Sequence, residues 1–209
     1  MNVRACAVAA FTSLVFFGGL LGGTHERAAA GAKGPSITPD DSVYQLTGLF
    51  KDQTGIEAHL DIARGHPVLL SMFYTSCTDA CPLLIAELRR IEATLSPALR
   101  EDVRVVLVSL DPERDTPSAM RRVADSHRLD GARWRLLTGT DDTIREVAAV
   151  LGVKFRRLSN GMINHSSVIA VLDRRGVIQS RTEGITPGDP KLVARVTAAL
   201  ERAASRTGG

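Results

Sequence analysis

The sequence has few of the residues that several functional classes need. Its 209 residues contain only 3 Cys, 6 Phe, 2 Tyr and 1 Trp, and so few aromatic rings leave little surface on which nucleic-acid bases could stack. The 26 basic and 23 acidic residues give a net charge of only +3, which lacks the strong basic excess of a nucleic-acid-binding protein. An apolar fraction of 44% excludes both a wholly disordered chain and a polytopic membrane protein. We therefore expect one folded domain and no nucleic-acid partner.

Long uncharged apolar runs are absent except near the start. Residues 5–23 carry no charge and follow a short basic segment that ends at Arg4, and Ala28 and Ala30 then offer a small-residue cleavage site. This layout predicts a secretory signal peptide over residues 1–30. The run is almost long enough to cross a bilayer, so an uncleaved N-terminal membrane anchor is the alternative. Either way we expect an exported protein, in the periplasm or on the extracytoplasmic face of the inner membrane, that touches the membrane only through residues 5–23.

The exported part reads as one domain. We expect a polar linker over residues 31–42, a folded domain over 43–203 and a frayed tail over 204–209. Short apolar runs predict strands, and leucine-rich 3.6-residue periodicity predicts helices. The expected elements are a hairpin over 44–60, strands over 68–74, 103–110 and 134–137, helices from about Pro82 to 95, from Pro117 to 129 and from Asp141 to 151, a second hairpin over 166–181, and a helix from about Pro190.

This element order defines the fold class. Strands and helices alternate, and the chain closes with a hairpin and a helix, which favours a three-layer α/β domain with a mixed central sheet flanked by helices. A cysteine pair between a buried strand and a helix makes a thioredoxin-like arrangement the natural interpretation.

Beyond the leader, which contains Cys6, the only cysteines are Cys77 and Cys81. A disulfide across three residues closes too small a loop to stabilise a fold strongly, so chemistry explains the pair better than structure does. Both cysteines lie at or just before a predicted helix N-terminus, where the helix dipole should lower the thiol pKa. Dithiol reductases generally have two intervening residues. The three found here let both sulfurs surround a common centre.

Two thiolates and one imidazole would suit Cu(I), Zn(II) or a blue-copper-like site. Of the five histidines, His165 stands just before a predicted strand, in the segment Met162-Ile163-Asn164-His165-Ser166-Ser167. The others that could supply an imidazole are His25, His59, His66 and His127.

Several motifs resemble one family in the same order and spacing. The segment 73–82 (FYTSCTDACP) resembles the metal loop of the SCO/SenC family, and residues 108–117, 137–140 and 164–166 match three further family motifs. The likeness covers roughly residues 44–200. It implies a thioredoxin-like copper chaperone that assembles the dinuclear copper centre of cytochrome c oxidase, with the copper-receiving oxidase subunit as its partner. By position, Cys77, Cys81 and His165 correspond to the three ligands of one copper ion.

Other readings of the same residues stay open. A metallochaperone is expected rather than an enzyme. A thiol–disulfide oxidoreductase would instead use Cys77 and Cys81 as a redox pair with His165 as a nearby base, and a redox or copper sensor would use their disulfide to control a partner. Either the chaperone or the enzyme would need a thiol reductant protein to keep the pair reduced. The loop 111–116 is most simply a helix-capping turn, and the alternative is that its aspartates support the site or dock a partner.

Overall fold

The computed structural model describes residues 39–78 and 80–206. The leader predicted for residues 1–30 and most of the predicted linker lie outside the described residues. The strands are β1 (Phe50–Asp52), β2 (Glu57–Ala58), β3 (Val68–Phe73), β4 (Arg104–Ser109), β5 (Trp134–Thr138), β6 (Phe155–Arg157), β7 (Ile163–His165), β8 (Ile169–Leu172) and β9 (Ile178–Arg181). The helices are η1 (Val43–Gln45), η2 (Leu60–Ala63), α1 (Ala80–Thr94), α2 (Pro97–Asp102), α3 (Pro117–Ser126), α4 (Asp141–Leu151) and α5 (Pro190–Ser205), where η marks a 3₁₀ helix.

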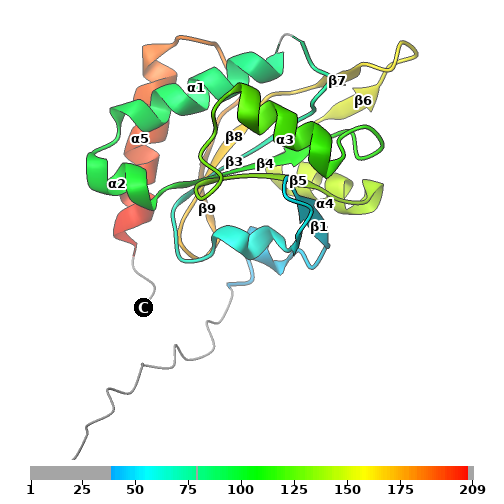
Figure 1. Cartoon of the computed structure of the whole chain (residues 1–209). Helices are drawn as coiled ribbons and strands as arrows, with labels where there is room; N and C mark the ends of the chain where they lie inside the picture. Colours follow the sequence, from blue (N-terminus) through cyan, green and yellow to red (C-terminus); the bar gives the residue numbers. More distant parts are fainter. Residues whose placement is uncertain (1–38, 79, 207–209) are drawn as a thin grey trace, which may run out of the picture. The chain divides into compact units, whose positions relative to one another are not determined.

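A mixed sheet forms the centre of the described chain, with helices flanking it (Figure 1). Its strand order is β2-β1-β5-β4-β3-β8-β9, and β6 pairs with β7 in a separate two-stranded sheet. Strand β3 pairs in parallel with β4 and antiparallel with β8, and β4 pairs in parallel with β5. The predicted mixed α/β sheet with N-terminal and C-terminal hairpins is therefore confirmed.

The apolar runs of the sequence form the core as expected. All six residues of β3 are buried, which agrees with a strand covered on both faces. In α1 the predicted apolar face is buried, and burying a leucine or isoleucine side chain stabilises the fold by about 1.5–3 kcal/mol. Its members are Leu84, Leu88 and Ile91, followed by Leu95 just after the helix. This packing fixes α1, and with it the loop that precedes α1.

Helix α1 begins two residues earlier than predicted, at Ala80 instead of Pro82. Cys81 therefore lies inside the first helical turn, whereas Cys77 precedes the helix. The prediction relied on the bias of a residue before proline against helical dihedrals. Pro82 itself is tolerated as the third helical residue because the first N–H groups of a helix have no intrahelical partner to lose, and Cys81 adopts helical geometry in spite of the steric bias.

Four other parts of the chain differ from the prediction. Tyr44 lies in η1, capped by the side chain of Ser42, so the first hairpin is shorter than expected. Helix α3 ends at Ser126 instead of Leu129, and the positive φ of 51° at Arg128 is incompatible with continuing it. Hairpin β6–β7 occupies a segment we expected to be a loop, and α5 carries helical structure to Ser205.

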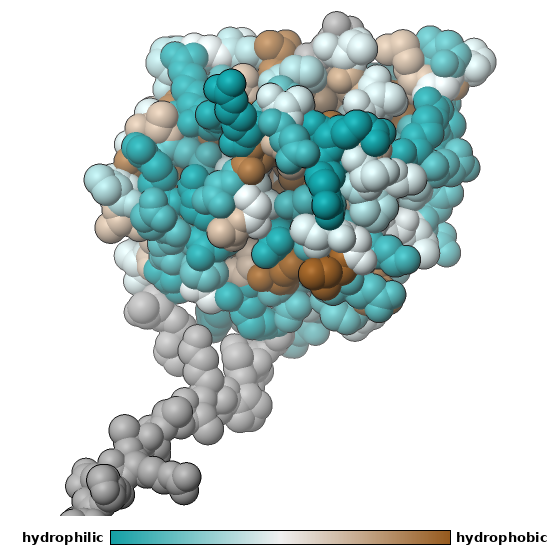
Figure 2. All heavy atoms as spheres, viewed as in Figure 1, coloured by the Kyte–Doolittle hydropathy of each residue, from teal (hydrophilic) through white to brown (hydrophobic). Residues whose placement is uncertain are grey.

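The face shown in Figure 2 is mostly hydrophilic, with small apolar patches between hydrophilic side chains. Within the part of the chain that the structure describes, no helix combines the length and the apolar character needed to cross a bilayer.

Candidate metal centre

The two cysteines meet at the N-terminus of α1. The backbone N–H of Cys81 donates to Sγ of Cys77 at 3.3 Å, so the first sulfur caps the helix. Sγ of Cys81 accepts the N–H of Tyr74, the residue that follows β3, at 3.5 Å. Both side chains are thiols. Strand β3 and helix α1 thus bring the predicted pair together in one short loop.

Burial governs the chemistry of Cys81. Its side chain is only 4% exposed, and this burial raises the pKa of the Cys81 thiol far above its usual value, with the neighbouring Cys77 and Asp115 acting in the same direction. The N–H of Tyr74 opposes the rise but does not offset it. The expectation that the helix N-terminus lowers the thiol pKa is therefore wrong for Cys81. A cation that binds this sulfur must displace its proton.

This difference predicts an uneven alkylation pattern in the reduced, metal-free protein. Cys77 is half-buried and Cys81 is buried, so iodoacetamide at pH 7 should modify Cys77 first. We expect Cys81 to react at least about tenfold more slowly, because each unit of raised pKa removes about tenfold of the reactive thiolate. Peptide mapping by mass spectrometry measures both rates. Faster labelling of Cys81 than of Cys77 would contradict the burial described here.

A buried carboxylate anchors the loop that carries the cysteines. Asp115 is fully buried and accepts the backbone N–H of Thr75 at 3.0 Å and its hydroxyl at 2.5 Å. The hydroxyl of Ser109, at the end of β4, donates to the same carboxylate at 2.5 Å. Burial raises the pKa of Asp115, although these hydrogen bonds oppose the rise. Asp115 therefore fixes Thr75, two residues before Cys77.

His165 is the last residue of β7, rather than the residue before the next long strand as expected. Its ring meets Tyr74 edge-on, with the ring centroids 5.8 Å apart and an interplanar angle of 77°. Nδ1 lies 3.2 Å from the carbonyl oxygen of Ser166. Burial lowers the pKa of His165, so the ring is neutral at pH 7. Because a carbonyl only accepts, Nδ1–H donates to it and Nε2 carries the lone pair that could bind a cation.

Tyr74 connects the two halves of the site. Burial raises the pKa of its phenol, Cys77 raises it further, and the backbone of Ile163 in β7 partly opposes these effects. The phenol is thus close to both the cysteine loop and the β6–β7 hairpin. However, no three His, Cys, Asp or Glu side chains among residues 39–78 and 80–206 are gathered closely enough to hold a metal. The structure pairs the two cysteines and places His165 beside Tyr74, but it does not assemble a finished ligand cluster.

The other described histidines make contacts elsewhere. Nδ1 of His59 lies 3.2 Å from the carbonyl oxygen of Gly48, and Nδ1 of His66 lies 2.8 Å from Oδ1 of Asp102. His127 is the C-cap of α3. His25 is outside the described residues. Among the described histidines, the one with a ring contact to the segment between β3 and α1 is therefore His165.

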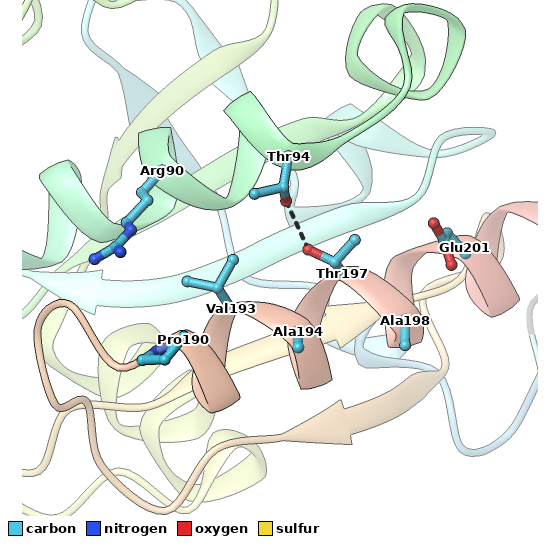
Figure 3. A pocket seen from close by; sticks show the side chains of 8 residues that line it. All are labelled: Arg90, Thr94, Pro190, Val193, Ala194, Thr197, Ala198 and Glu201. Atoms are coloured by element: carbon cyan, nitrogen blue, oxygen red, sulfur yellow. Dashed lines mark hydrogen bonds between the residues drawn. The ribbon is translucent and has the colours of Figure 1, made fainter.

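A groove of about 500 Å³ lies between α1 and α5 (Figure 3). Thr94 and Thr197 are joined by a 2.9 Å hydrogen bond across it. Val193 and small alanine side chains line the α5 side, and none of the candidate ligands lines the groove. The groove is therefore separate from the candidate site in the loop between β3 and α1.

Comparison with known proteins finds similarity to SCO proteins at both the family and the individual level. A family model described as SCO1/SenC matches residues 42–201. An SCO2-like protein of Rickettsia prowazekii is 30% identical over 131 residues, which cover 60% of this chain and 62% of the relative. The SCO1 protein homolog of Bacillus subtilis is 30% identical over 105 residues, which cover 50% of this chain and 54% of the relative. The chain thus spans about three fifths or less of the length of these curated relatives.

A solved structure supports the same assignment. The copper-bound ScoI of Bradyrhizobium japonicum is 25% identical, with a TM-score of 0.60, and the match covers 75% of this chain and 97% of that one. The fold is thioredoxin-like, as the position of the cysteine pair predicted.

Proposed function

The chain belongs to the SCO1/SenC family, and from this premise we propose that it is an exported copper chaperone that binds one copper ion through Cys77, Cys81 and His165. It delivers this copper for assembly of the dinuclear copper centre of cytochrome c oxidase, so its partner is the copper-receiving oxidase subunit. The sequence of residues 1–30 supports export to the periplasm or to the extracytoplasmic face of the inner membrane, either as a cleaved signal peptide or as an anchor.

The observation that carries the proposal is the sulfur pair at the N-terminus of α1, with a neutral imidazole nearby. Soft thiolates and an imidazole favour Cu(I) over hard cations. The related ScoI of Bradyrhizobium japonicum, whose structure contains copper, supports the same cargo. Because the three side chains are not gathered in advance among the described residues, the imidazole of His165 must turn toward the sulfurs when copper binds, while the hairpin that carries it keeps its place. Such an adaptable site suits a protein that has to release its cargo.

A second function is favoured by one observation. Cys77 is half-buried and Cys81 is buried, as expected for an attacking thiol and a resolving thiol in thiol–disulfide exchange. In this reading the Cys77 thiolate attacks a disulfide of the partner and releases one partner thiolate. Cys81 then attacks the Cys77 sulfur of the mixed disulfide, which forms the Cys77–Cys81 disulfide and releases the second partner thiolate. Such exchange needs neither copper nor His165.

An anaerobic Cu(I) titration against a chromophoric competitor tests the proposal. We expect the reduced protein to bind one equivalent, and His165→Ala to bind at least about tenfold more weakly, because even residues behind the ligands contribute about 10–100-fold to metal affinity. The matched control is His127→Ala, since His127 caps α3 and should bind as the wild type does.

The result separates the two functions. Binding no tighter than the competitor, or binding that is indifferent to His165, would refute the three-ligand chaperone site. The same protein would then be assayed for disulfide reduction.

A further inference from the structure

We propose that Arg157 is a positioning residue for copper binding: through its ion pair with Asp111 it holds the β6–β7 hairpin, and with it His165, in place beside the cysteine pair. This inference rests on the proposed function, because it gives His165 the role of a copper ligand.

The ion pair has a deeply buried anchor. Asp111 follows β4 and is fully buried. Nη2 of Arg157 donates to its Oδ1 at 2.9 Å, and Nε of Arg114 lies 3.3 Å from its Oδ2. A buried carboxylate needs compensating charge, and removing one partner of such a pair is costly. The hairpin is therefore bound to the body of the domain through a buried carboxylate, and slippage of the hairpin would leave Arg114 as its remaining cationic partner.

The strand register places Arg157 and His165 on the same face of the hairpin. Phe155 pairs with His165, and Arg157 pairs with Ile163. Side chains alternate along a strand, so these four share one face. Ile163 is only 4% exposed, which identifies this face as the one turned toward the domain, although the side chain of Arg157 keeps 37% of its surface exposed. Arg157 therefore fixes the face that His165 presents to Tyr74.

The hairpin turn is fastened to the same loop. Nη2 of Arg114 donates to the carbonyl oxygen of Gly161 at 2.9 Å. Gly161 has a φ of 79°, so the turn needs glycine for its conformation. The guanidinium of Arg114 thus touches Asp111 and the turn at once.

One loop consequently supports both halves of the site. Asp111 holds Arg157 of the hairpin, and Asp115 holds Thr75 of the cysteine loop. Residues 154–166 contain no Asp or Glu, so the hairpin has no acidic group of its own to replace Asp111. This answers the question that the sequence left open about loop 111–116: its aspartates support the site from within and are not exposed for docking.

The test compares two arginines that are adjacent in sequence and face opposite ways. Both arginines are exposed. Arg157→Met removes the ion pair with Asp111, and Arg156→Met removes an equal charge from the opposite face of β6. We expect Arg157→Met to weaken Cu(I) binding about tenfold, the lower end for residues that support metal ligands, and Arg156→Met to bind as the wild type does. Arg157→Lys keeps the positive charge but lacks the planar guanidinium group, and its Cu(I) affinity should fall between those of the wild type and Arg157→Met.

A double-mutant cycle with His165→Ala distinguishes positioning from general destabilisation. If Arg157 acts through His165, Arg157→Met should cause no further loss in the His165→Ala background. Wild-type affinity in folded Arg157→Met, or losses that add in the double variant, would overturn the proposal. If Arg157→Met does not fold, wild-type affinity in Arg157→Lys together with additivity of that variant would overturn it equally. Wild-type affinity in His165→Ala alone would instead refute the proposed ligand set. The cycle therefore distinguishes failure of the ligand set from failure of the positioning role of Arg157.

Discussion

Replacing either cysteine with serine should remove tight copper binding. We expect the Cu(I) affinity of Cys77→Ser and of Cys81→Ser to fall by about a hundredfold to a thousandfold. The estimate divides the roughly 10–16 kcal/mol of a four-ligand structural zinc site among its ligands, which gives about 2.5–4 kcal/mol for each. The anaerobic competition titration measures the loss. A hydroxyl is a poor ligand for a soft cation, so serine keeps the shape of the side chain without its affinity.

The control for these variants lies between the two cysteines and β3. Ser76 is exposed, so Ser76→Ala changes the same loop without touching a sulfur and should bind copper normally. In Cys81→Ser the hydroxyl can still accept the N–H of Tyr74, which Sγ accepts at 3.5 Å in the wild type, so the fold should survive. Copper binding that persists at wild-type affinity in either cysteine variant would refute a site in which both thiolates are ligands.

The position of the cysteine pair between a strand and a helix could be predicted, because local sequence patterns determine both elements. The run 68–74 is apolar throughout, and leucines recur at helical spacing after Pro82, so strand β3 and helix α1 were visible and the loop between them followed. The exact helix start was not, since Pro82 satisfies the preferences of the third helical position as well as those of the first. Short-range rules therefore located the loop but not the turn to which Cys81 belongs.

The ion pair that holds the β6–β7 hairpin could not be predicted, because its two residues are far apart in the sequence. Arg157 and Asp111 are 46 positions apart, and no local pattern pairs them. The arginines of β6 hide its strand character, although the Asn160–Gly161 step in the turn is a hairpin signal that could have indicated β6 and β7. The raised pKa of Cys81 is equally a tertiary effect, because the helix N-terminus is a local feature whereas burial depends on everything packed around the sulfur.

These features together would allow one small loop to combine thiol redox chemistry with the proposed copper binding. The sulfurs are held at a helix N-terminus by main-chain donors, and the imidazole approaches from a separate hairpin. Reduction state can therefore change two of the three proposed ligands while the hairpin and the central sheet stay in place.

Oxidation of the pair should accordingly abolish copper binding. When an added oxidant such as diamide takes two electrons and two protons from Cys77 and Cys81, an S–S bond forms and no thiolate remains to bind the cation. We expect the oxidised protein to bind no Cu(I) in competition with the chromophoric ligand, and a phosphine reductant to restore one equivalent. The closed loop is much shorter than the 15 residues for which about 3 kcal/mol of stabilisation is expected, so the disulfide should be readily reduced.

Copper should in turn protect the pair from oxidation. In the loaded protein both sulfurs donate their electron pairs to the cation, so diamide should form the disulfide much more slowly than in the metal-free protein, as measured by counting thiols after quenching. The matched comparison is the His165→Ala variant, in which weaker binding should leave the thiols less protected. Full Cu(I) affinity in the oxidised protein would show that the cation is held elsewhere. Equal oxidation rates with and without copper would show that at least one sulfur is not a ligand, which would leave thiol exchange as the better account of the pair.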